Sequence, residues 1–134
     1  MKNGSEFAYL ESSALVKLAI VEEESDALQN ALRAWPRRVS SRLAVVEVLR
    51  TVRRRHAARE PFARDVLQRV DLVVIGDGIL MSASLLEPAV LRSLDAIHLA
   101  TALRVRGALA AFVSYDGRQL EAAESLGLPT ASPR

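Results

Sequence analysis

Short segments with strand character alternate with longer amphipathic segments along the whole chain. The strand-like segments are Ala8–Leu10, Arg37–Ser40, Asp71–Ile75 and Ala110–Ser114, followed by a last extended piece after Gly127. Helical patterns separate them, and no two of them are joined by the short turn of a hairpin. This alternation predicts an α/β domain with a central parallel sheet of about four or five strands, flanked by helices on both faces.

The segment from Leu91 to Arg106 carries the most distinctive helical pattern. Its apolar residues cover nearly the whole circumference, so we expect the helix to be packed on most sides. Asp95 is its only acid, and Ser93 is a plausible N-cap that would place Asp95 in the first turn. The other expected helices follow Ser12 or Ser13, run from 22 to 34, 43 to 58 and 62 to 70, begin near Gly78, and run from 118 to 126.

Length and composition fit one compact domain. The chain has 134 residues, half of them hydrophobic, which is enough for one core and too few for two. Residues 1–7 are expected to be an expression-tag remnant, so the domain is expected to cover 8–134. No apolar run approaches the roughly 20 residues that span a bilayer and no leader pattern is visible, so we expect a cytoplasmic protein. The absence of cysteine excludes disulfides and thiolate metal sites.

Arginine dominates the positive charge. The net charge is only +2, but sixteen of the eighteen basic residues are arginines. Arginine binds phosphate and carboxylate groups through a planar fork, which indicates an anionic partner, although a GC-rich genome gives the same bias. Five of them crowd the end of one predicted helix: Arg50, Arg53, Arg54, Arg55 and Arg59. They are interpreted either as a solvated face that complements the helix dipole or as a surface that meets phosphates.

Four acids stand where the predicted topology would bring them together. Glu11 and Asp116 each follow a strand, so they emerge at the same edge of a parallel sheet, and Glu47 and Asp95 lie near the starts of helices. Clustered carboxylates repel one another unless a cation neutralises them, and oxygen ligands favour Mg²⁺ or Mn²⁺. Each acid taken alone also has an adequate role as a helix cap or a solvated residue. Asp77, after another strand, is a reserve candidate.

The sequence segments around these acids resemble the acidic motifs of PIN-domain ribonucleases. The runs that carry the resemblance are YLESSALVKL from Tyr9, SRLAVVEVLR from Ser41, LRSLDAIHLA from Leu91 and FVSYD from Phe112. In this order and spacing the chain is similar to VapC toxins of bacterial type II toxin-antitoxin systems. The resemblance implies a Mg²⁺- or Mn²⁺-dependent endoribonuclease that cuts structured RNA, either tRNA or rRNA, inhibits translation and is neutralised by a VapB-type antitoxin.

Carried over position by position, the resemblance assigns the metal-binding and catalytic acids to Glu11, Glu47, Asp95 and Asp116. It also matches Ser114 to the small hydroxyl residue that precedes the last acid in this family. Ser13 is expected to form a hydrogen bond near the same site. One departure stands out: the first acid of this family is usually aspartate, whereas here it is Glu11. We therefore expect reduced activity. His98, one turn past Asp95, is expected to be a core or structural histidine.

Two other functions remain open at this stage. A non-catalytic α/β module that binds the arginines of a protein partner would use the same acids without turnover. A hydrolase of small phosphoesters would also use them but would cleave a chromogenic phosphate ester, which a nuclease would not. The apolar helices and the resemblance further predict a homodimer that forms a hetero-oligomer with its antitoxin.

Overall fold

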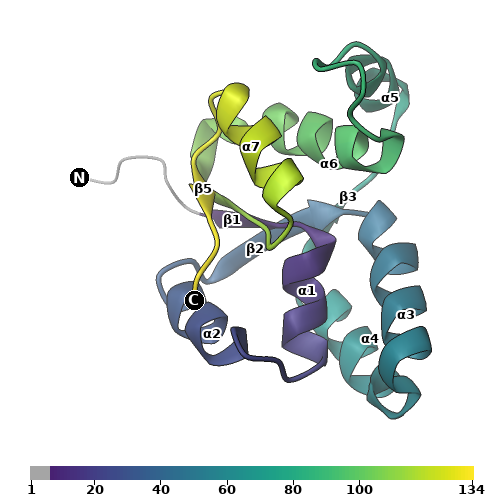
Figure 1. Ribbon diagram of the computed structural model, residues 1–134, viewed down its shortest axis with the longest axis vertical. Coiled ribbons are helices and arrows are strands. Elements are labelled where there is room, and N and C mark those ends of the chain that lie inside the picture. Colours follow the sequence, from purple (N-terminus) through teal and green to yellow (C-terminus); the bar gives the residue numbers. More distant parts are fainter. Residues whose placement is uncertain (1–6) are drawn as a thin grey trace.

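The computed structural model of the protein describes residues 7–134 and shows an α/β fold (Figure 1). Its five strands are β1 Phe7–Leu10, β2 Arg37–Ser41, β3 Asp71–Val73, β4 Leu109–Val113 and β5 Thr130–Ala131. They form one sheet in the order β3-β2-β1-β4-β5, and every pairing is parallel. The predicted fold class is thereby confirmed. The expected tag remnant lies outside the described residues except for Phe7, which is the first residue of β1 and is buried.

The strand order changes direction between β1 and β4. From β1 the chain adds strands on one side, through β2 to β3, and then crosses over to add β4 and β5 on the other side. The connections that leave β1 and β4 therefore diverge to opposite faces of the sheet and open a crevice at the carboxyl ends of these two strands. Ligands of such sheets bind in this crevice.

Helices cover both faces of the sheet. Their bounds are α1 Ser12–Ala19, α2 Ser25–Leu32, α3 Leu43–His56, α4 Glu60–Gln68, α5 Asp77–Ser84, α6 Ser93–Arg104 and α7 Gly117–Ser125, with 3₁₀ turns at Ala57–Arg59 and Arg106–Ala108. Helices α1 to α4 pack on one face, α6 and α7 on the other, and α5 lies against α6 (Figure 1).

Strand β1 supplies side chains to both cores because successive residues of a strand point to opposite faces. Ala8 and Leu10 join the core beneath α1 to α4, whereas Phe7 and Tyr9 join the core beneath α6 and α7. The Tyr9 ring stacks on Phe112 of β4 with ring centroids 5.3 Å apart. The central strands are thus buried on both sides, as parallel strands usually are.

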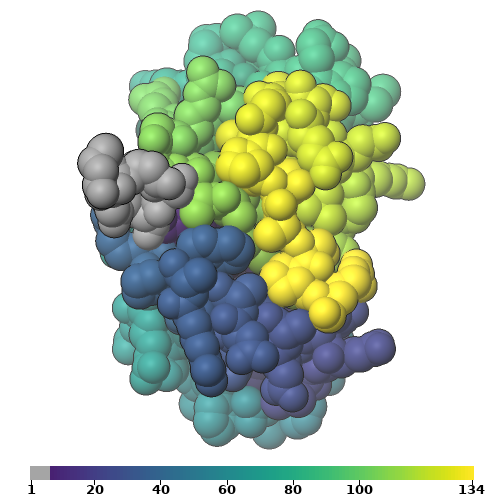
Figure 2. Space-filling model, turned by 90° about the vertical axis from the view of Figure 1, so that its left-hand side faces the viewer, coloured from purple at the N-terminus to yellow at the C-terminus, as the bar shows by residue number. Residues whose placement is uncertain are grey.

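The C-terminal segment crosses from α7 to α2, and Figure 2 shows it in yellow against the blue of α2. Arg134 forms an ion pair with Glu24 at 3.2 Å, and the Tyr115 hydroxyl donates a hydrogen bond to the Pro133 carbonyl at 2.8 Å. Lys17 Nζ lies 4.7 Å from the centre of the Tyr115 ring. These contacts hold the end of the chain beside the carboxyl edge of the sheet.

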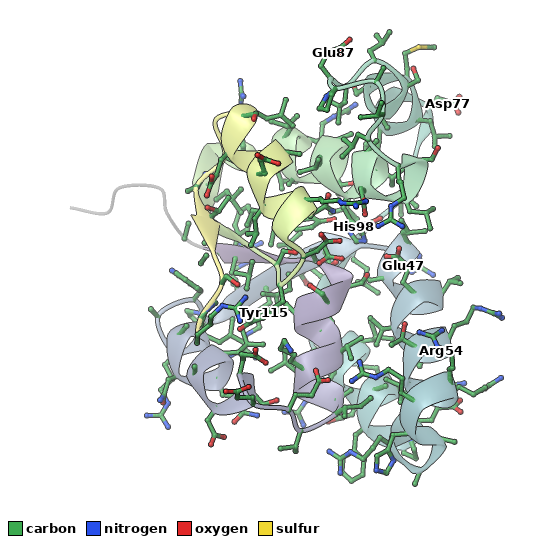
Figure 3. The ribbon with its side chains drawn as sticks, in the orientation of Figure 1. Glu47, Arg54, Asp77, Glu87, His98 and Tyr115 are labelled. Atoms are coloured by element: carbon green, nitrogen blue, oxygen red, sulfur yellow. The ribbon has the colours of Figure 1, made fainter. Side chains whose placement is uncertain are left out.

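Several element boundaries differ from the prediction. Strand β3 ends at Val73, two residues early, because it lies at the edge of the sheet and Val74 already points into solvent, 70% exposed. The N-cap of α6 is Arg92 instead of Ser93. Asp77 is the first residue of α5, with Gly76 at the N-cap, and Figure 3 shows it far from Glu47. Asp77 therefore does not join the other acids.

Helix α6 is buried along most of its length, as its sequence predicts, with buried residues at Ala96 and from His98 to Ala102. Its first turn is more open, since Leu94 is 49% exposed. No helix in residues 7–134 combines the length and the apolar character needed to cross a membrane.

Truncation of Leu99 tests the packing of α6 on the sheet. Leu99 is fully buried, so Leu99→Ala should lower the free energy of unfolding by about 2–5 kcal/mol through lost contacts and a cavity. Val21→Ala, between α1 and α2, is the control, because Val21 is 80% exposed and its truncation should cost about 0.5 kcal/mol or less. Urea denaturation measures both, and equal losses would contradict the assignment of this core.

Candidate active site

The first and last predicted acids meet at the crevice between β1 and β4. Glu11 directly follows β1 and is the N-cap residue of α1, and Asp116 follows β4 and is the N-cap residue of α7. The two connections touch, because the backbone N–H of Glu11 donates to the carbonyl of Val113 at 3.0 Å. The start of each following helix, with its unpaired N–H groups, faces this edge of the sheet.

Serine hydroxyls hold the Glu11 carboxylate. Its Oε1 accepts hydrogen bonds from Ser13 Oγ at 2.5 Å and from Ser114 Oγ at 2.8 Å, and the residue is only 8% exposed. Ser13 Oγ also accepts from the backbone N–H of Tyr115 at 2.8 Å. Ser114 Oγ likewise accepts from the N–H of Asp116 at 3.1 Å. The expected hydrogen bond of Ser13 is thus made to Glu11, and Ser114 connects the first acid to the loop that carries the last.

Asp116 has two roles at once. Its Oδ1 caps α7 by accepting hydrogen bonds from the backbone N–H groups of Arg118 at 3.0 Å and Gln119 at 3.4 Å. Its other carboxylate oxygen accepts no hydrogen bond from a described residue. The cap therefore fixes the orientation of the carboxyl group through one of its two oxygens.

Asp95 lies in the first turn of α6, and its side chain is 19% exposed. Partial burial raises the pKa of Asp95 above its ordinary value, and the negative charge of Asp116 raises it further. The charge of Arg92, whose Nε forms an ion pair with the Asp95 carboxylate at 3.7 Å, acts on the pKa in the opposite direction. Burial and the charge of Asp116 together outweigh this pairing, so the ionised form of Asp95 is disfavoured in the free protein.

Glu47 approaches the same region from α3 (Figure 3). Its Oε1 accepts a hydrogen bond from Ser12 Oγ at 2.6 Å and another from His98 Nε2 at 2.7 Å. Burial alone would raise the pKa of Glu47, but the hydrogen bond from His98 lowers it below the ordinary value, with help from the hydrogen bond from Ser12. Glu47 is therefore held as an ionised carboxylate.

His98 links Glu47 to the core of the sheet. The ring is fully buried, and its Nδ1 lies 2.6 Å from the hydroxyl of Tyr9. A neutral imidazole satisfies both partners when Nε2–H donates to Glu47 and Nδ1 accepts from the Tyr9 hydroxyl. The expectation of a buried histidine is confirmed, and the structure adds a role in orienting an acid. Its position one turn after Asp95 was the only sequence signal for this role.

A basic groove leads to the acids. It has a volume of about 660 Å³ and runs between α1 and α3, with Glu11 and Glu47 at one end. Its basic lining residues are Lys17, Arg50, Arg54 and Arg55. Lys17 and Arg55 are already paired with Glu22, whereas no ion pair to a described residue involves Arg50 or Arg54. Figure 3 shows Arg54 on α3, farther from α6 than Glu47.

The four acids do not form a ready metal cage. Within residues 7–134 no three histidine, aspartate or glutamate side chains are grouped closely enough to enclose a metal ion. Glu11 and Glu47 are turned toward hydroxyl and imidazole groups, while the negative charge of Asp116 acts on Asp95. Mg²⁺ commonly binds through one or two carboxylates and keeps several waters. The donor set at this edge fits such a hydrated ion.

The sequence matches the family model described as PIN domain over residues 8–125. It is 44% identical over 125 residues to Ribonuclease VapC46 of Mycobacterium tuberculosis strain H37Rv, with 93% of this chain and 96% of that protein covered. Ribonuclease VapC35 of the same species is 45% identical over 130 residues, at the same coverage.

Among solved structures, a toxin-antitoxin complex from Klebsiella pneumoniae has a chain with a similar fold. The TM-score is 0.68 at 24% identity, and the match covers 84% of this chain and 89% of that one. The family match and the close relatives span nearly the whole domain. The chain therefore belongs to the PIN-domain family and, within it, to the VapC ribonucleases.

Proposed function

We propose that the protein is a divalent-metal-dependent endoribonuclease and the toxin of a toxin-antitoxin system. The observation that carries the proposal is the pair Asp95 and Asp116, two carboxylates in a shared negative field at the edge of a PIN sheet, beside an arginine-lined groove. Such a field attracts a divalent cation, and the groove suits a phosphate backbone. Kinship to the VapC ribonucleases supports the same reaction class.

The four acids and the two serines beside Glu11 have different roles in this proposal. Asp95 and Asp116, with Glu11 and Glu47, would hold the cation, which when bound activates water and offsets charge on the scissile phosphate. Ser13 and Ser114 orient Glu11.

The remaining groups support the acids and the substrate. His98 and Ser12 fix Glu47 in its ionised form and keep it from turning toward solvent. Arg50 and Arg54 are placed to bind neighbouring phosphates through their guanidinium groups. We infer that the substrate is a structured RNA, either tRNA or rRNA, whose cleavage inhibits translation in the cytoplasm.

A protein partner is part of the same proposal. We infer that a VapB-type antitoxin neutralises the enzyme by placing a basic side chain among the acids, where the negative field would bind it. A homodimer is also proposed, and the exposed apolar side chains of α5, Leu80 and Met81, support an interface there. Light scattering on the isolated chain would measure its mass.

RNA cleavage is the direct test of the function. Total RNA incubated with the protein and Mn²⁺ should show new ends that recur at one position of one RNA species, when the ends are mapped by sequencing. Asp95→Asn should abolish those ends, because it removes a carboxylate that would hold the cation. A chromogenic phosphate ester should not be hydrolysed. Turnover of that ester without RNA cleavage would favour a small-phosphoester hydrolase instead.

Metal binding should be visible in thermal stability. Millimolar Mn²⁺ or Mg²⁺ should raise the melting temperature of the parent, because a ligand that binds only the folded state stabilises it. Asp95→Asn should lose much of that response. A melting temperature indifferent to both cations would contradict the proposed site.

The raised pKa of Asp95 gives a second expectation for the same variant. A folded-state pKa above the unfolded value means that the contribution of Asp95 to stability is present at low pH and lost as pH rises through the folded pKa. Without metal at pH 7, Asp95→Asn should therefore be more stable than the parent. This gain should shrink below about pH 4, near the ordinary aspartate pKa. Urea denaturation at the two pH values measures it, and a less stable variant at pH 7 would refute the sign.

Glu11→Asp tests the departure from the usual first acid. If the extra methylene of Glu11 holds the carboxylate away from the position that the cation requires, the aspartate variant should cleave RNA with Mn²⁺ about tenfold faster or more. Initial rates on one mapped substrate measure this. Asp95→Asn in the same background should remove the activity. A parent that cleaves well and a variant that is no faster would show that the site accommodates glutamate.

A further inference from the structure

A second pocket has one of the four acids in its lining. It has a volume of about 480 Å³, within the range of about 300–1,000 Å³ typical of small-molecule sites. Asp95 lines this pocket, whereas Glu11 and Glu47 line the basic groove. The acids therefore contribute to two separate recesses, and an RNA strand whose reacting phosphate lies at the acids can contact both.

The walls of this pocket are apolar. Pro88, Val90 and Leu91 form one side and Ala122 of α7 contributes to the other. Val90 is 88% exposed, and covering its side chain with an apolar or flat surface would be favourable in free energy. The flat face of an unstacked nucleobase offers such a surface, and sequence-specific recognition of RNA relies on bases that have left their stack.

The charges of the pocket balance, whereas four basic and three acidic side chains line the basic groove. Two arginines, Arg92 and Arg118, face two acids, Asp95 and Glu121. A recess without net charge is a poor site for a phosphate backbone, which binds mainly through positive charge. It suits an uncharged base, whose edge carries both donors and acceptors.

Two of these polar side chains are free to act on a ligand. Arg118 and Glu121 stand three residues apart on α7, and neither side chain makes an ion pair or hydrogen bond to a described residue. The Arg118 guanidinium offers donors for acceptor atoms such as O6 and N7 of guanine, and the Glu121 carboxylate offers acceptors for amino groups. Together they can read the edge of a base that stacks against the apolar wall.

We propose that the pocket between the start of α6 and α7 is a nucleobase subsite that binds one unpaired base next to the scissile phosphate, with Arg118 and Glu121 as its specificity determinants. The inference rests on the proposed ribonuclease function and assigns the two recesses different tasks. The basic groove binds the backbone without regard to sequence, and the α6–α7 pocket selects the cleavage site.

Binding measured without metal separates this subsite from catalysis. The probe is a fluorescent oligonucleotide spanning the mapped cleavage site, together with copies in which one nucleotide near the cut is abasic. Fluorescence anisotropy in EDTA gives the Kd of each. For the parent, one abasic position should weaken binding about tenfold or more, because a well-read base contributes on this scale.

Substitutions in the pocket and in the groove should then behave differently. Arg118→Ala and Glu121→Gln should each weaken binding of the intact probe about tenfold. Their affinity for the probe that lacks the recognised base should equal that of the parent. Arg54→Ala in the basic groove should weaken both probes equally. All three residues are solvent-exposed, so each variant should remain folded, which circular dichroism checks.

Four outcomes would overturn the subsite. It fails if no abasic position weakens binding to the parent, or if Arg118→Ala weakens intact and abasic probes alike. It also fails if the pocket variants leave RNA binding unchanged and weaken only the association with a protein partner. If the variants cleave at the parent's position with unchanged selectivity, the pocket does not select the site even though the ribonuclease function stands. Absence of RNA cleavage by the parent, in contrast, would refute the proposed function itself.

Discussion

Strands β1 and β4 pair in parallel at the centre of the sheet, and the backbone bond from Glu11 to Val113 continues that pairing one residue past β1. The order of strands reverses here, so the two connections part to opposite faces and leave their first polar residues facing one another. Glu11 and the segment from Ser114 to Asp116 are adjacent for this reason alone. If the pairing shifted by one residue, the side chains at the ends of both strands would point to the opposite face.

Around this crevice the polar side chains are arranged in two hydrogen-bonded sets. Ser13 and Ser114 hold Glu11, while Ser12 and His98 hold Glu47. A buried carboxylate without partners would be costly, so these contacts make it feasible to bury charge beside the core. The balance is incomplete at Asp95, whose raised pKa reflects burial and the charge of Asp116. A partly buried acid whose ionised form is disfavoured lowers stability in the free protein, which is a common property of sites that bind a ligand.

The fold and the placement of the end-of-strand acids could be predicted from sequence, because both depend on local pattern. Glu11 and Asp116 follow segments with clear strand character, and parallel pairing then brings them to one edge. The relation between Glu47 and His98 could not be predicted in this way. These residues are 51 positions apart, and their contact depends on how α3 and α6 pack on opposite faces of the sheet. The α6–α7 pocket could not be predicted from sequence either, because it also depends on how helices that are distant in sequence pack together.

The contacts of Glu11 show how one substitution changes the neighbours of a site. The carboxylate reaches both Ser13 and Ser114, and those hydroxyls also accept hydrogen bonds from the backbone N–H groups of Tyr115 and Asp116. The longer side chain of glutamate is therefore built into the connection between β4 and α7. A shorter carboxylate at this position would give up part of its contact with the hydroxyls and gain freedom to face the other acids. The length of the side chain therefore determines whether the carboxylate oxygens stabilise the loop after β4 or add negative charge to the crevice.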